Sequence, residues 1–203
     1  MKKYVESSMT FDEYVALIDR LLLDGKTTGP NQSEAMVHYG VLNRQRMRRL
    51  EKTIKLNEST IDAARNTDHK MVWLILTEGW CGDAAQNIPV IEKIAAESVN
   101  IFTRYLLRDE NPGLMNKFLT YNARSIPKLI ALDGNSFELL GTWGPRPKEL
   151  MEHFFEMRDG GMESSLIKEN IQRWYLKNKG QAVQKEFEGL LINWNNSELF
   201  RAA

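Results

Sequence analysis

Residues 71–84 have the sequence Met-Val-Trp-Leu-Ile-Leu-Thr-Glu-Gly-Trp-Cys-Gly-Asp-Ala, and this stretch decides the fold. The apolar run 72–77 has the length of a strand, and its continuous apolar character is typical of a buried parallel strand. Residues 81–97 follow with apolar side chains at helical spacing, and Pro89 inside them should kink the helix because it removes one backbone hydrogen bond. Cys81 therefore lies at a turn from strand to helix.

Cys81 is the only cysteine among 203 residues, so no intramolecular disulfide and no cysteine-rich zinc site can form. A thiol at a helix N-terminus faces unpaired N–H groups and the positive end of the helix dipole, and both favour the nucleophilic thiolate. Gly82 lets the backbone turn closely, and Trp80 is placed to shield the sulfur and contact a substrate. Asp83 opposes thiolate formation. We expect an activated thiol, although less acidic than one beside Lys or His; a small buried hydrophobe is the alternative.

Helical segments are predicted around this region. Apolar side chains recur at helical spacing over residues 11–22 and between 33 and 66, where a break near Gly40 or Asn57 is expected. The order strand, helix, strand, helix, strand, strand, helix over residues 71–157 predicts an α/β or α+β sandwich with a mixed sheet. We expect one compact unit with three parts: an N-terminal helical extension (1–70), an α/β core (71–158) and a C-terminal helical extension (159–203).

Within the core, a hairpin is expected at Asp133-Gly134-Asn135 and a turn at Asn111-Pro112-Gly113. These turns separate elements of ordinary length. The expected strands span 72–77, 99–107, 128–132 and 137–142, and the expected helices span 81–97, 114–121 and 148–157.

A second candidate element is Ser125-Ile126-Pro127, which precedes the third strand. Proline at the first residue of a strand costs no ladder hydrogen bond. A cis Ile126–Pro127 bond would make a tight bend and leave the Ile126 backbone free to pair with an extended peptide. Most X-Pro bonds are trans, so this motif by itself is a weak signal.

Together these residues resemble the thioredoxin superfamily over about residues 71–157. The motif Trp80-Cys81-Gly82 matches the start of the family's active-site signature, and Pro89 stands five residues beyond Ala84, as the helix proline of the family does. Ile126-Pro127, with Pro127 lying 46 residues beyond Cys81, matches the cis-proline step. Gly144 is expected near the glycine that completes the family's substrate surface. The whole chain is similar to a bacterial group of thioredoxin-like proteins with W-C-G-D motifs and extra terminal helices.

The sequence departs from that family at two positions. Ala84 replaces the second, resolving cysteine, and Ile75 replaces the buried acid that helps to deprotonate it. A mixed disulfide at Cys81 therefore cannot be released from within the chain, which excludes ordinary dithiol reductase activity.

The resemblance implies a catalytic Cys81 and a substrate surface. The leading hypothesis is a monothiol thiol-disulfide oxidoreductase that acts on mixed disulfides of a protein or a low-molecular-weight thiol, with an external thiol as resolver. The alternative is a non-catalytic thioredoxin-fold module that binds a peptide or partner. The substrate-binding candidates are Trp80, Gly82, Asp83, Ile126, Pro127 and Gly144.

Composition narrows the remaining possibilities. Basic and acidic residues number 27 each, so net charge gives no indication of a nucleic-acid partner. No apolar run approaches the ~20 residues that span a bilayer, and we expect a cytoplasmic protein. No cofactor or metal is expected, because the three histidines are scattered. The basic run over residues 44–49 is interpreted as a solvated helix face, and Arg146 as a residue that could face an anionic thiol substrate. The sequence predicts no oligomeric state.

Overall fold

The apolar run beginning at Met71 forms strand β1 (Met71–Thr77), every residue of which is buried. The computed structural model describes residues 1–197, and within them β1 lies at the centre of a four-stranded sheet of order β2-β1-β3-β4. β1 pairs in parallel with β2 (Ile101–Leu107) and antiparallel with β3 (Lys128–Asp133), which pairs antiparallel with β4 (Leu139–Trp143). The sheet is therefore mixed, as predicted, in a thioredoxin-like α/β fold with extra terminal helices.

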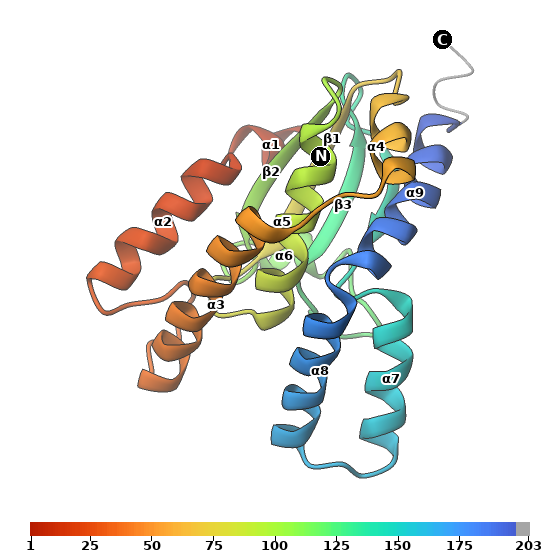
Figure 1. The fold of residues 1–203 in the computed structure, drawn as a ribbon. Coiled ribbons are helices and arrows are strands. Elements are labelled where there is room, and N and C mark those ends of the chain that lie inside the picture. The colour runs from red at the N-terminus through yellow and green to blue at the C-terminus, as the bar shows by residue number, and fades with distance from the viewer. Residues whose placement is uncertain (198–203) are drawn as a thin grey trace.

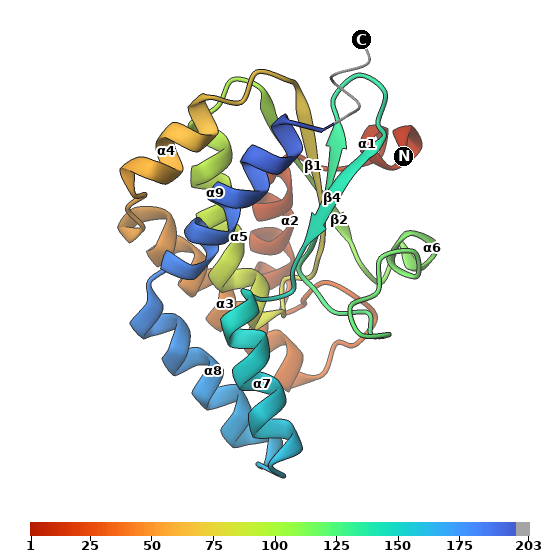
Figure 2. The same cartoon turned by 90° about the vertical axis from the view of Figure 1, so that its right-hand side faces the viewer.

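Helices surround this sheet. Figure 2 shows α5 (Gly82–Ala96) and α9 (Gln181–Asn195) on one side of the sheet and α6 (Pro112–Met115) on the other. Thr10 caps α2 through a reciprocal pair of hydrogen bonds with Glu13. The remaining helices are α1 (Lys2–Glu6), α2 (Phe11–Leu23), α3 (Glu34–Thr53), α4 (Glu58–Arg65), α7 (Lys148–Asp159) and α8 (Ser164–Asn178).

The C-terminal helix α9 contributes large side chains to the main core. The fully buried Trp73 of β1 packs edge-on against Phe187, with ring centroids 5.2 Å apart, and against Trp194, at 5.9 Å. Buried aromatic pairs of this geometry stabilise a fold beyond their buried area. The tail beyond Gly161 thus shares a core with the sheet.

Helices α7 and α8 form a pair that extends beyond the sheet in Figure 1. They share a second, smaller apolar cluster that includes Leu150, Ile171 and Tyr175. This pair places α8 beside the start of α5, where Gln86 donates a hydrogen bond to Gln172 at 2.8 Å.

The structure settles one local alternative, changes the bounds of one helix and adds another. Gly40 does not interrupt α3; the break falls between Thr53 and Glu58, at the alternative site near Asn57. Helix α6 begins at Pro112 and ends at Met115, earlier than expected, because proline fits the first turn of a helix. The short helix α1 was not expected. No helix within residues 1–197 has the length and apolar character needed to cross a membrane.

Candidate functional site

Cys81 is the N-cap residue of α5, at the turn predicted from the sequence. Its Sγ accepts a hydrogen bond from the Ala84 N–H at 3.4 Å, and its thiol donates one to the Ile126 carbonyl at 3.3 Å. Only 7% of the residue is exposed. The thiol therefore lies between the start of α5 and the segment before β3, with both of its hydrogen-bonding capacities used inside the protein.

Burial raises the pKa of the Cys81 thiol to about 12, and the negative charge of Asp83 adds to this effect. The N–H groups of Ala84 and Asp83 and the charge of Arg146 oppose the rise but do not cancel it. The expectation of an activated thiol is therefore wrong for this arrangement. The sequence indicates the helix N-terminus, which lowers the pKa of the thiol, but it does not show the desolvation by surrounding elements, which raises that pKa.

Asp83 is held in a network that joins three parts of the fold. Its carboxylate forms an ion pair with Arg146, whose NH2 lies 2.7 Å from Oδ2, and it accepts a hydrogen bond from the Tyr175 hydroxyl at 2.9 Å. Asn87 donates to the Tyr175 hydroxyl at 3.0 Å and to the Pro145 carbonyl at 3.1 Å. Arg146 also lies over the Phe154 ring. The guanidinium is thus paired with Asp83, and Arg146 still lines the pocket beside Cys81, so its role toward an anionic substrate stays a prediction.

The Ile126–Pro127 peptide bond is cis, as predicted, and so is the Gly144–Pro145 bond, which was not predicted. Gly144 has a φ of +105°, and a Cβ at this position would collide with the Pro127 carbonyl oxygen. Only glycine satisfies both conditions without strain. The structure therefore brings Pro127 and Gly144 into contact, while the Ile126 carbonyl is occupied by the Cys81 thiol.

A pocket of about 550 Å³ opens beside Cys81, within the size range of ligand sites. Trp80 to Asp83 form one wall, whereas Ile126, Pro127 and Gly144 do not line it. Gly82 allows α8 to approach, because a Cβ there would lie 3.2 Å from Gln172 Nε2. Arg146, from the loop before α7, also lines the pocket, and the other walls come from α3 and α8 and include Met36, Tyr39, Arg46, Lys168, Ile171 and Gln172.

Sequence reasoning missed these α3 and α8 residues. The basic run at 44–49 was the one available signal, and nothing in the α8 sequence marked its side chains. Among the residues that the structure describes, no group of three or more His, Cys, Asp or Glu side chains is placed to hold a metal ion.

Comparison with known proteins agrees with this fold. The family described as Thioredoxin matches residues 29–159, so the chain belongs to the thioredoxin family. Two solved structures are similar over almost the whole chain: a protein of unknown function from Pseudomonas aeruginosa (14% identity, TM-score 0.57, 98% of this chain and 96% of that one) and an HIV epitope scaffold (13% identity, TM-score 0.58, 100% and 98%). At these identities the likeness concerns the fold alone. The comparison with curated proteins finds no match.

Proposed function

We propose that this protein is a thioredoxin-fold binding module that recognises a partner at the pocket beside Cys81 and holds Cys81 as an unreactive thiol. The observation that carries the proposal is the state of the sulfur. The Cys81 residue is only 7% exposed and both hydrogen bonds of its sulfur are made inside the protein, and burial together with Asp83 raises the pKa of the thiol, so the thiol stays protonated at neutral pH. The absence of a second cysteine supports the same reading.

The second candidate is the monothiol oxidoreductase. It is favoured by the position of Cys81, which keeps the helix N-cap and the contact with the cis-proline segment. In that mechanism the Cys81 thiolate attacks a mixed disulfide, one sulfur leaves as a thiolate and takes a proton, and Cys81 stays bound to the other. A low-molecular-weight thiol, as thiolate, then attacks that new disulfide and releases Cys81.

The remaining finer assignments belong to the proposal as well. We place the chain in the bacterial group with W-C-G-D motifs, in the cytoplasm, with a protein as its partner. The extra helices support a protein partner, because α3 and α8 build most of the pocket.

The test is a pH titration of Cys81 combined with an activity assay. Thiolate absorbance is followed between about pH 6 and pH 11, with Cys81→Ser as the blank. In a separate assay, a protein cysteine capped by a low-molecular-weight thiol is the substrate, and its reduction is measured with added thiol. A module shows no thiolate over most of this range and no turnover above Cys81→Ser. A thiol pKa near or below 8.5 together with turnover would establish the oxidoreductase instead.

A further inference from the structure

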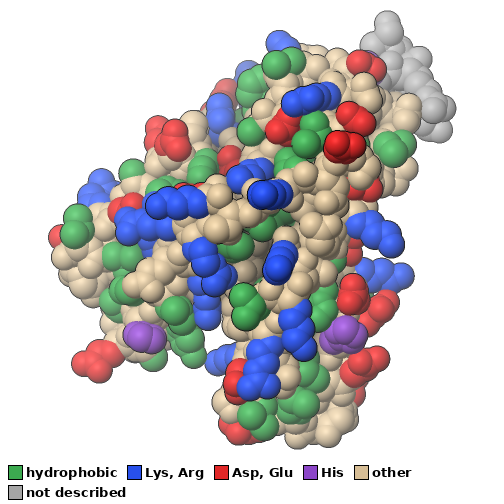
Figure 3. Space-filling view, viewed as in Figure 1, with side chains coloured by type: hydrophobic (Ala, Val, Ile, Leu, Met, Phe, Trp, Pro, Cys, Tyr) green, Lys and Arg blue, Asp and Glu red, His purple; other side chains and the backbone are tan. Residues whose placement is uncertain are grey.

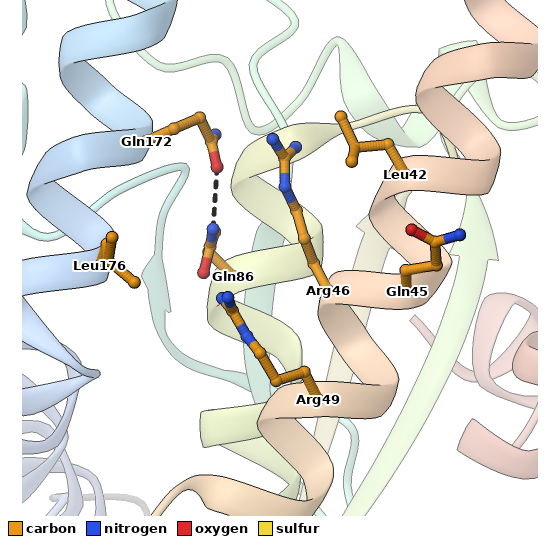
Figure 4. Close-up of a pocket in the computed structure, with 7 residues that line it drawn as sticks. All are labelled: Leu42, Gln45, Arg46, Arg49, Gln86, Gln172 and Leu176. Carbon is orange, nitrogen blue, oxygen red and sulfur yellow. Dashed lines mark hydrogen bonds between the residues drawn. The ribbon is translucent and has the colours of Figure 1, made fainter.

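The basic run on α3 divides between two faces of the helix. Arg44 points inward, and its side chain is only 9% exposed. It forms ion pairs with Asp19 at 2.9 Å and with Glu51 at 3.2 Å. Arg48 also pairs with Asp19, at 3.0 Å. Arg46 and Arg49 point the other way, toward α8 (Figure 4). The interpretation of this run as one solvated face is therefore wrong.

Arg46 and Arg49 line a row of three adjoining hollows between α3 and α8, which we call the α3–α8 groove. Beside the pocket at Cys81 lies a second hollow of about 380 Å³ that shares Arg46 and Gln172 with it. A third, of about 430 Å³, shares Arg49, Gln86 and Leu176 with the second. In Figure 4 the hydrogen bond from Gln86 of α5 to Gln172 of α8 lies beside the side chains of Arg46 and Arg49.

Positive charge collects in this groove although the whole chain is neutral. Of the acidic residues that line it, Asp83 is paired with Arg146 and Glu169 with Arg173. Figure 3 shows Lys and Arg side chains gathered over the middle of this face. Within residues 1–197, five lining cations form no ion pair with a carboxylate: Arg46, Arg49, Lys55, Lys168 and Lys179.

Arg46 shows the cost of this arrangement in the free protein. It is half-buried, and burial together with the like charge of Arg49 lowers its pKa. An anion bound between the two guanidinium groups would offset the repulsion between them and give the half-buried Arg46 a partner of opposite charge. The groove is thus built to receive negative charge.

Its length and lining indicate what carries that charge. From Tyr39 to Thr53 the groove follows α3 for about 20 Å, which matches about six residues of extended polypeptide. Leu42 and Leu176 lie between the cations, and Tyr39 and Met36 lie at the Cys81 end. A phosphate backbone gains nothing from the aliphatic contacts, whereas a peptide with both acidic and apolar side chains uses both.

We propose that the α3–α8 groove binds an extended, acidic peptide segment of a partner protein, with one end of that segment beside Cys81. This inference rests on the proposed binding function and names the chemistry of its partner. Charge complementarity supplies the selection, and the apolar residues between the cations add contact area.

The test measures binding of labelled peptides to the Cys81→Ser variant by fluorescence anisotropy. The probe is an octapeptide of alternating Glu and Leu, compared with its Lys/Leu counterpart and with an oligouridylate. We expect saturable binding of the acidic peptide that weakens as salt is raised, and no binding of the basic one. Tighter binding of the oligouridylate than of the acidic peptide would overturn the proposal in favour of RNA.

The groove is then changed in pairs. Arg46→Glu with Arg49→Glu should weaken binding of the acidic peptide by about tenfold or more, and the milder Arg46→Gln with Arg49→Gln should weaken it less. The matched control, Lys117→Glu with Lys185→Glu, changes net charge equally at exposed positions outside the groove and should leave binding unchanged. Equal losses in the control, or no saturable binding at all, would overturn the proposal.

This experiment is independent of the thiol. Because the Cys81→Ser variant carries no thiol, failure of the peptide to bind removes the groove proposal alone. A reactive Cys81 in the titration described above removes the module reading, and peptide binding would then define the substrate of the oxidoreductase.

Discussion

The surroundings of Cys81 and the α3–α8 groove lie side by side, yet the charged groups around Cys81 have partners inside the protein and the arginines of the groove have no carboxylate partner among the described residues. Around Cys81, the Asp83 carboxylate, the Arg146 guanidinium and the thiol all have partners inside the protein. In the groove, Arg46 and Arg49 have no carboxylate partner within the described chain. Charges that are satisfied internally contribute to folding, whereas charges left unpaired along a groove are available for a ligand. The sequence motif around Cys81, which we call the closed region, therefore has its charges paired inside the protein. The α3–α8 groove, which we call the open region, has cations that are unpaired within residues 1–197 and no sequence motif.

The largest effect is expected from breaking the closed region. Arg146→Gln leaves the Asp83 carboxylate, 12% exposed in its side chain, without its cation, and should lower the free energy of unfolding by about 3–5 kcal/mol. Denaturant unfolding measures the loss. Adding Asp83→Asn to this variant removes the stranded charge and should recover part of the stability. Simple addition of the two single losses would show that the ion pair is not coupled.

The next largest effect concerns Gly144. Substitution by Ala places a Cβ against the Pro127 carbonyl at a positive φ, so we expect a loss of more than about 2 kcal/mol in unfolding free energy. Gly161 is the matched control, because it also has a positive φ but nothing within 4 Å of an added Cβ. Gly161→Ala should cost only about 1 kcal/mol, from backbone strain alone. Equal losses at both positions would show that the contact with Pro127 carries no energy.

A smaller effect is expected on the thiol itself. Asp83→Asn removes a negative charge that raises the pKa of Cys81, so the thiolate should form at lower pH. Thiolate absorbance against pH measures this change. Asp62→Asn, at an exposed position on α4, is the control and should leave the titration unchanged. A shift to higher pH in Asp83→Asn would contradict the assigned direction.

The smallest effect is expected in the groove. Arg49→Gln removes an unpaired cation beside Arg46, so unfolding free energy should stay within about 0.5 kcal/mol of its original value, with any change toward greater stability at low salt. The same substitution at Arg146 is the internal comparison. A loss at Arg49 as large as that at Arg146 would mean that the groove arginine has a structural role and would erase the contrast between the two regions.

Much of the fold was predictable because local signals agreed with it. The apolar run of β1, the cap at Thr10 and the hairpin between β3 and β4 each have a short-range physical cause. The break after Thr53 and the extent of α6 were less predictable, since tertiary packing and one proline shift such ends by several residues.

The candidate site was predictable only in part. Cys81, the cis Ile126–Pro127 bond and the proximity of Gly144 to Pro127 follow from spacing within the chain and from the family resemblance. The pairing of Asp83 with Arg146 and Tyr175 joins residues 63 and 92 positions apart, and no local pattern indicates it.

Sequence alone specifies the order of the core strands and helices, the position of the single thiol and the loss of an internal resolving cysteine. The tertiary structure sets how that thiol behaves, because desolvation and the charge of Asp83 depend on what packs around the sulfur. It also decided which arginines of α3 are paired and which line a groove, because helical residues two positions apart face different neighbours. Local secondary structure can be predicted from neighbouring residues in the sequence, whereas the electrostatics of a site depend on elements that meet only in the folded protein.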